Sequence, residues 1–241
     1  MINIRRHCAV PASLTSQEIK DYINQVLAYL NGEQPTEPEK PGTYRTSDLL
    51  EAFDECFFSK CYLTEEKFEN SWAMDIDHFL PQKDRPDLIY DWNNLFPAGH
   101  YANMTKPRKY PPGGYLNPCD PTDDVEKEIL YTLLPLDKPN FSAKDINNIK
   151  AVNTARLLDI VHNGSNNNGY QATATLRHFI HKKENELLNT IIEWKDLPEN
   201  SDDKHHVEVK LKRMLSRKSS FTMLCRSIAA VRRYIPKEFL D

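Results

Sequence analysis

Cysteines, long apolar runs and a secretion signal are scarce or absent in this 241-residue chain. Its five cysteines form an odd, scattered set with no CxxC pair, which predicts reduced thiols in a cytosol and argues against a disulfide framework. No run approaches the roughly 18 apolar residues of a transmembrane helix, and the opening M-I-N-I-R-R-H-C lacks the apolar core of a signal peptide. We therefore expect a cytoplasmic protein. The cysteines are Cys8, Cys56, Cys61, Cys119 and Cys225.

Net positive charge is found only at the C-terminal end. Residues 204–241 contain ten Lys and Arg against three Asp and Glu, whereas the preceding 203 residues carry a net charge of −11. A basic segment attached to an acidic body is typical of a region that binds a polyanion or a protein partner. An ordinary solvated helix face has the same composition, so the sequence leaves both interpretations open.

Residue types that suit phosphodiester hydrolysis gather between residues 75 and 106, where the chain reads D-I-D-H-F-L-P-Q and later N-L-F-P-A-G-H-Y-A-N-M-T-K. An imidazole, with an ordinary pKa near ~6.5, is well suited to deprotonate water, so His78 is the candidate general base. Asp77 and Asn103 offer the hard oxygen ligands that Mg²⁺ prefers. Lys106 shares a helix face with Asn103 and would hold a phosphate. Asn94 is interpreted as a scaffold residue that fixes His78.

Taken singly, these residues also fit a buried histidine and turn-forming asparagines, but their order and spacing resemble the core of HNH nucleases. Such cores carry Asp or Glu before His, then Asn-Leu, then a metal-binding His or Asn nine residues after that Asn, and a Lys three further on. Asn94, Asn103 and Lys106 have these spacings. The D-x-D-H-x-x-P-Q run is similar to that of the His-Asn-Asn HNH domain in CRISPR effector nucleases.

The resemblance implies a ββα-metal hairpin and helix. Its first strand is expected to end near His78, its second strand to hold residues 94–97, and its helix to run from near His100 to before Pro107. Asp75 matches the first Asp of the run and is an alternate or supporting metal ligand. His100 is a further candidate at the metal or the phosphate, although a capping or surface histidine is the simpler interpretation.

Basic residues follow the expected helix. Lys106, Arg108 and Lys109 begin a loop, P-R-K-Y-P-P-G-G-Y, where a nucleic-acid substrate could pass. We therefore expect these three side chains to bind nucleic acid.

Many HNH domains of this layout bind a structural zinc through two CxxC pairs. The four positions here are Cys61, Thr64, Gly99 and Ala102, so three thiolates are absent and no Cys₄ site can form. We expect Mg²⁺ or Mn²⁺ as the cofactor, no structural zinc, and a hairpin stabilised by aromatic packing instead. The aromatic residues are Phe57, Phe58, Tyr62, Phe68, Trp72, Phe79, Trp92 and Phe96.

The whole chain predicts a mostly α-helical α+β fold with a small central ββα-metal core. Three parts are expected: a helical arm (1–56) with a Pro-rich loop (33–42), the nuclease core (57–110), and a helical region (111–241) with the basic tail 204–241. A capping box at Thr15-Ser-Gln-Glu18 begins the first helix, and Ser142 is expected to cap another over 146–161. Residues 128–136 have strand character, and 163–169 form a turn. Further helices are predicted at 47–57, 171–195, 202–216 and 219–234.

The wider layout resembles the PtuB family, the HNH effectors of Septu antiphage systems, including those linked to retrons. The resemblance rests on the M-I-N-I-R-R opening, the K-C-Y-L-T-E entry to the core, an N-P-C-D-P-x-D-D segment and an E-x-E-I-L-Y run. It implies a regulated toxic nuclease that works with a PtuA-like ATPase of the ABC or SMC type. In retron-linked systems it also implies a reverse transcriptase and its DNA–RNA hybrid. The substrate would be DNA, or RNA such as tRNA.

Two other functions stay open. A stand-alone restriction or homing-type HNH endonuclease would normally carry a sequence-reading module, and the sequence shows no helix-turn-helix or zinc-finger motif. A catalytically silent HNH-like scaffold would have no chemical reason to keep Asp77, His78, Asn94 and Asn103 together.

Overall fold

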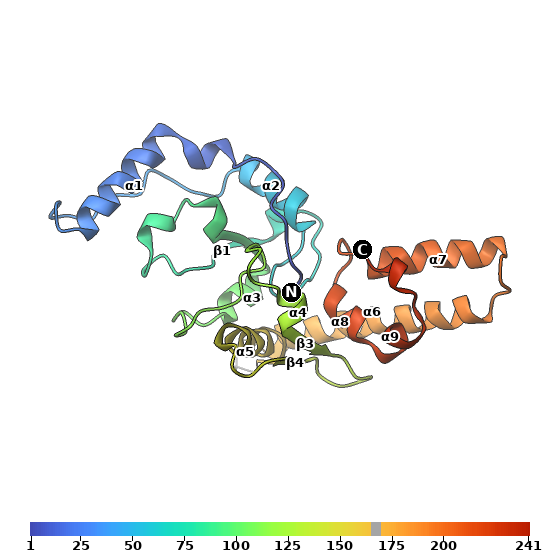
Figure 1. Ribbon diagram of the computed structural model, residues 1–241. Coiled ribbons are helices and arrows are strands. Elements are labelled where there is room, and N and C mark those ends of the chain that lie inside the picture. Colours follow the sequence, from blue (N-terminus) through green and yellow to red (C-terminus); the bar gives the residue numbers. More distant parts are fainter. Residues whose placement is uncertain (165–169) are drawn as a thin grey trace.

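The computed structural model describes residues 1–164 and 170–241, and it confirms the expected mostly helical α+β fold. The described residues form two two-stranded antiparallel sheets, β1 with β2 and β3 with β4. In Figure 1 the N-terminal arm and the pair formed by α6 and α7 extend to opposite sides of the molecule. The predicted turn at 163–169 lies almost entirely outside the described residues. None of the described helices is long and apolar enough to cross a membrane.

Pairs of strands lie between groups of helices along the chain. The helices and strands are α1 (Gln17–Leu30), α2 (Ser47–Phe57), β1 (Asp75–His78), β2 (Leu95–Ala98), α3 (His100–Thr105), α4 (Val125–Glu128), β3 (Ile129–Thr132), β4 (Asn140–Ala143), α5 (Ile149–Asn163), α6 (Tyr170–Asp196), α7 (Asp202–Leu215), α8 (Thr222–Ser227) and α9 (Ala229–Tyr234). Short 3-10 helices span Ala12–Thr15, Ser71–Ala73, Pro86–Leu88, Trp92–Asn94 and Lys237–Phe239.

The hairpin of β1 and β2 followed by α3 has the expected ββα layout. Asp75 pairs with Ala98 and His78 with Leu95, so the strands are in register over their whole length. Residues of β2 are buried on both faces because aromatic rings and α2 surround it. Of the eight aromatic residues expected around the hairpin, five are buried, two are partly buried, and Trp72 is 58% exposed. Aromatic packing therefore stabilises the hairpin.

Helix α1 begins one residue later than the capping box at Thr15 predicts. Thr15 belongs to the preceding 3-10 helix, and the Ser16 hydroxyl accepts the backbone N–H of Ile19 as the N-cap of α1. A serine one position along makes the same type of cap, so the helix start shifts without loss of a hydrogen bond. The predicted helix at 47–57 is confirmed as α2.

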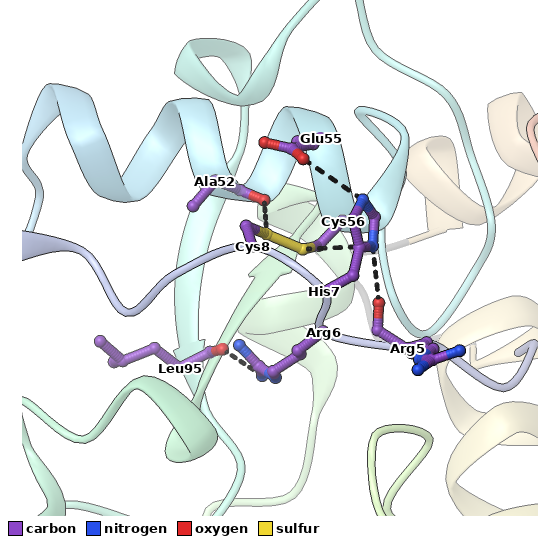
Figure 2. Close-up of a disulfide and its surroundings, with 8 residues drawn as sticks. All are labelled: Arg5, Arg6, His7, Cys8, Ala52, Glu55, Cys56 and Leu95. Carbon is purple, nitrogen blue, oxygen red and sulfur yellow. Dashed lines mark hydrogen bonds and ion pairs between the residues drawn. A yellow bond between two sulfur atoms is a disulfide. The ribbon is translucent and has the colours of Figure 1, made fainter.

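A disulfide between Cys8 and Cys56 ties the N-terminal segment to α2 (Figure 2). The expectation that all five cysteines are reduced is therefore wrong for this pair. The physical reason is proximity: the N-terminal segment runs along α2, where the Ser13 N–H donates to Asp48, and the two Cα atoms lie 6.6 Å apart across a separation of 48 residues. Sequence spacing carries no sign of this contact. Cys61, Cys119 and Cys225 are free.

One helix cap predicted in the central region is wrong. Ser142 lies in β4, which pairs with β3, and α5 instead begins after Asn148, whose side chain accepts the N–H of Ala151. Residues 140–143 form a strand rather than a helix start because pairing with β3 buries Tyr131 and Phe141 together against α5, with ring centroids 5.8 Å apart. The strand character at 128–136 is confirmed for β3.

The C-terminal region contains α6 and α7 close to the predicted ranges, but the single helix expected at 219–234 is wrong. It divides into α8 and α9 because Ile228 has a non-helical backbone, with φ −60° and ψ 133°, which buries its side chain. Several basic residues of 204–241 are paired, such as Arg217 with Glu126 at 2.5 Å, whereas Lys210 and Arg213 are exposed. The basic tail thus combines structural ion pairs with a solvated face.

Buried charges connect the chain ends with the entry to the hairpin. Glu65 forms an ion pair with the α-amino group of Met1 at 2.7 Å and with Lys60 at 3.4 Å. Lys60 also donates to the carbonyl of Arg217 at 2.8 Å and to the hydroxyl of Thr222 at 3.2 Å. Burial opposes ionisation of Glu65, but the two cations lower the pKa of this carboxyl to about 2. The division at residues 56 and 110 stays a prediction, and these contacts cross both boundaries.

A second buried titratable group predicts how stability depends on pH. His162 is 1% exposed, and burial lowers its pKa from 6.5 to about 4. Because the folded pKa lies below the unfolded one, only the unfolded chain binds a proton between these values. We expect the free energy of unfolding, measured by urea denaturation, to fall by up to ~3 kcal/mol as the pH is lowered through this window.

The matched variant His162→Gln keeps a side-chain donor for the Leu158 carbonyl, which His162 Nδ1 contacts at 2.8 Å. It should flatten the curve between pH 6.5 and about 4. It should not change the loss of stability below pH 4.5, where Glu65 becomes protonated in the unfolded chain but keeps its low pKa in the folded chain. An unchanged slope in the variant would assign the acid sensitivity to other groups.

Candidate active site

Two carboxylates of β1 face one polar side chain of α3 and one of the residue that ends it. Side chains two residues apart in a strand lie on one face, which places Asp75 and Asp77 together, while Asn103 lies in α3 and Lys106 follows it as the C-cap. The Asn103 amide donates to Asp75 Oδ2 at 3.1 Å, and the Lys106 ammonium donates to Asp77 Oδ2 at 2.7 Å. The predicted metal ligands and the predicted phosphate-binding lysine therefore lie at one strand–helix contact.

His78 ends β1 and is held in one tautomer. Its Nε2 lies 3.0 Å from the carbonyl oxygen of Ile89, which can only accept, so Nε2 carries the proton and Nδ1 is unprotonated. The Gln82 amide donates to Nδ1 at 3.1 Å. His78 is 7% exposed, and burial lowers its pKa, which favours the neutral ring. A neutral imidazole with an unprotonated Nδ1 is the form that a general base requires.

Asp77 is buried, and two side chains, Tyr62 and Lys106, donate hydrogen bonds to the same carboxylate oxygen. The Tyr62 hydroxyl donates to Oδ2 at 2.5 Å, beside the Lys106 ammonium. Lys106 also donates to the backbone carbonyls of His78 at 2.8 Å and Phe79 at 3.4 Å, and its side chain is 7% exposed. In this structure Lys106 thus neutralises Asp77 rather than pointing into solvent, where a phosphate would meet it.

Asn94 binds the backbone of the loop that follows β1. Its Oδ1 accepts the N–H of Leu80 at 2.7 Å, and its amide donates to the carbonyls of Leu80 at 3.1 Å and Leu88 at 3.2 Å. This loop supplies both partners of the His78 ring, Gln82 and Ile89. Asn94 therefore contacts the scaffold around His78 and none of the reacting positions.

The remaining candidates lie at the outer edge of the site. His100 is 77% exposed at its side chain, and its Nδ1 lies 2.9 Å from Asp75 Oδ2, whose side chain is 34% exposed. Arg108 and Lys109 are exposed just beyond α3, while Lys106 is not. A nucleic acid would meet these outer residues before it met Asp77 or His78.

The donor set fits a hard divalent cation. Asp75 and Asp77 place carboxylates at the β1–α3 contact, where the Asn103 amide lies against Asp75, and carboxylate and amide oxygens are ligands that Mg²⁺ and Mn²⁺ favour. Within the described residues no group of three or more His, Cys, Asp and Glu is placed to hold a metal. The fit therefore depends on the amide of Asn103 as a third ligand beside two carboxylates.

Cys61 and Thr64, two of the four positions where related domains hold zinc, are hydrogen-bonded to each other. Cys61 is fully buried, and its sulfur accepts the backbone N–H of Thr64 at 3.4 Å. Burial raises the pKa of the Cys61 thiol, although hydrogen bonds from Thr64 and from the Gly99 backbone oppose this effect. A protonated single thiol among amides is a poor zinc ligand, and the expectation of no structural zinc stays a prediction.

Three residues contact the candidate site although the sequence interpretation gave Gln82 and Tyr44 no role and expected Tyr62 only in aromatic packing. Gln82 lies in the D-I-D-H-F-L-P-Q run and Tyr62 in the K-C-Y-L-T-E entry, so motif positions could have suggested both. Tyr44 lies outside any motif, and its ring meets the His78 ring edge-on with centroids 4.9 Å apart. The contact of Tyr44 with His78 spans 34 residues of chain and had no sequence signal.

Comparisons with known proteins find one partial relative. The chain matches no protein-family profile and no solved structure. A segment of 53 residues is 36% identical to the Septu protein PtuB of Bacillus thuringiensis. This segment is 22% of the present chain and spans about a fifth, 19%, of the length of that relative. The chain is thus similar to PtuB over a limited segment.

Proposed function

We propose that this protein is a metal-dependent HNH endonuclease that hydrolyses phosphodiester bonds of nucleic acid. The observation that carries the proposal is the tautomer of His78, whose unprotonated Nδ1 lies at the end of the strand that also presents Asp75 and Asp77 to Asn103. A general base beside hard oxygen ligands is the arrangement that one-metal phosphodiester hydrolysis needs.

Each side chain has a role in this mechanism. Nδ1 of His78 takes the proton from the attacking water, and the hydrogen bond from Nε2 to Ile89 stabilises the imidazolium that forms. Asp77 and Asn103, with Asp75 as an alternate ligand, would hold Mg²⁺ or Mn²⁺. The bound ion would supply charge neutralisation at the departing oxygen. Lys106, released from Asp77 when a cation replaces its charge, would bind a phosphate oxygen.

A regulated defence role is the second part of the proposal. The similarity to PtuB supports a Septu-type effector that works with a PtuA-like ABC- or SMC-type ATPase, and in a retron setting with a reverse transcriptase and its DNA–RNA hybrid. Exposed apolar residues of α1 and α6, such as Leu30 (53%) and Ile192 (58%), offer docking surface to such a partner. DNA and tRNA are both candidate substrates of the proposed nuclease.

A catalytically silent scaffold is the competing function, and one observation favours it. Asp77 is engaged by Lys106 and Tyr62, and the lone pair of His78 is engaged by Gln82, so neither is open to substrate in this structure. A nuclease held inactive until its partner acts would show the same contacts. Activity in the assembled complex separates the two.

The test is to purify this protein with and without its co-encoded neighbour and to compare cleavage of DNA and tRNA at fixed salt. We expect weak cleavage by the isolated chain and strong, nucleotide-dependent cleavage by the complex, because the acidic body disfavours free binding to a polyanion. Equal, strong cleavage by the isolated chain would instead indicate a stand-alone restriction or homing-type enzyme.

A further inference from the structure

The segment between α1 and α2 lies against the proposed general base. Residues 40–46 of this segment, together with Gln82, make up what we call the strap. Tyr44 packs edge-on against the His78 ring, and the Gln82 amide lies 3.4 Å from the Tyr44 hydroxyl and 3.1 Å from His78 Nδ1. With Ile89 on Nε2, both ring nitrogens are occupied. The strap therefore closes the side of the ring that water would have to reach.

Contacts at both ends hold the strap in place. The Lys40 ammonium donates to Gln82 Oε1 at 3.0 Å, and the Arg45 guanidinium donates to the carbonyls of Met74 at 2.7 Å and Trp72 at 2.6 Å, just before β1. A few hydrogen bonds and the ring contacts of Tyr44 attach the strap, and Lys40 is exposed. Such an attachment can open without unfolding the hairpin.

An aromatic series links the strap to helix α1. Tyr22 of α1 meets Tyr90 at 5.7 Å between centroids, Tyr90 meets Tyr44 at 6.2 Å, and the Tyr90 hydroxyl donates to the carbonyl of Gly42 at 2.6 Å. In Figure 1 the chain leaves the far end of α1 and returns to α2 beside the loop that follows β1. These packed rings thus connect α1 to the strap.

We propose that the strap is an autoinhibitory cap: Tyr44 and Gln82 cover His78 in the resting protein, and the strap must withdraw before water can reach Nδ1. This inference rests on the proposed function of His78 as the base. It also accounts for a base that is 7% exposed and would be inaccessible to a phosphodiester in this state. The cap itself has a consequence that can be measured without any cleavage assay, namely protection of His78 from chemical modification.

The experiment measures the rate at which diethyl pyrocarbonate modifies His78 in the full chain at fixed pH, by mass spectrometry. The exposed residues His205 and His206 serve as internal references. In the wild-type protein we expect His78 to react far more slowly than either. Tyr44→Ala and Gln82→Ala should each raise its rate by up to about tenfold, the effect of removing one modest closing contact.

Tyr29→Ala is the matched control, because it removes a tyrosine from the same arm at a 36% exposed position of α1 with no contact to His78. Urea denaturation of each variant separates local opening from unfolding. Wild-type His78 reacting as fast as His205, or no acceleration in either strap variant, would overturn the proposal. Acceleration without cleavage in the partner complex would leave the cap in place and refute the nuclease function instead.

Discussion

Replacing His78 by alanine is expected to remove hydrolysis from the assembled complex. The variant lacks the Nδ1 that accepts the proton of water, and it keeps all three candidate metal ligands. General-base contributions are typically ~10²- to 10⁴-fold, so cleavage should fall by that range. The measurement is the initial rate of DNA or tRNA cleavage by equal amounts of wild-type and variant complex, with circular dichroism and co-purification to check folding and partner binding.

The matched control is His205→Ala, an exposed histidine of α7 that contacts none of the candidate residues. This variant should cleave at the wild-type rate. A His78→Ala complex that still cleaves at a near wild-type rate would remove the general-base mechanism, whatever the His205 variant does.

A change at Asp77 is expected to weaken both cleavage and its dependence on Mg²⁺. Asp77→Ala is a poor probe, because it strands the buried Lys106 ammonium, and breaking a buried ion pair in this way costs about 3–5 kcal/mol. Asp77→Asn keeps the shape and one acceptor oxygen for Tyr62 and Lys106 while removing the charge. Loss of a charged metal ligand should lower the rate by ~10²-fold or more and shift the Mg²⁺ titration to higher concentration.

Asn103→Ala should act in the same direction through the amide ligand, without affecting the Lys106 ion pair. Cys61→Ser is the control, since it changes the only cysteine left at the zinc positions and should leave cleavage and Mg²⁺ dependence nearly unchanged. Stoichiometric zinc in the purified protein that disappears in Cys61→Ser would show that the interpretation of those positions is wrong. An Mg²⁺ titration identical in wild-type and Asp77→Asn would exclude Asp77 as a ligand.

Local patterns predicted the fold where short-range physics decides it. The helix at 47–57 was predicted because its apolar spacing acts within a few residues. The helix that follows Gly99 was implied by the resemblance to HNH cores, with Pro107 setting its end. The strand β4 was missed because its pairing with β3 depends on burying Phe141 against α5. The break at Ile228 was missed for a similar reason, since tertiary burial overrides helix propensity there.

In the candidate site, too, local patterns predicted some features, and contacts between distant segments determined the others. Motif spacing placed Asp77, His78, Asn103 and Lys106 in one region, and the structure brings them together at the contact of β1 with α3. Their catalytic and metal-binding roles stay predictions. The disulfide of Cys8 and the contact of Tyr44 with His78 join segments that are distant in sequence, and no local pattern could reveal them.

The buried ammonium of Lys60 also bears on how the chain matures during synthesis. Lys60 lies at the entry to the hairpin, yet two of its hydrogen-bond acceptors, the Arg217 carbonyl and the Thr222 hydroxyl, are more than 150 residues further along. Domains generally fold as they emerge from the ribosome, but a buried charge without its acceptors is strongly destabilising. Although Glu65 is a nearby partner of Lys60, we expect the entry to the hairpin to complete its packing only after residues 217–222 have been made, so truncated products should lack that packing.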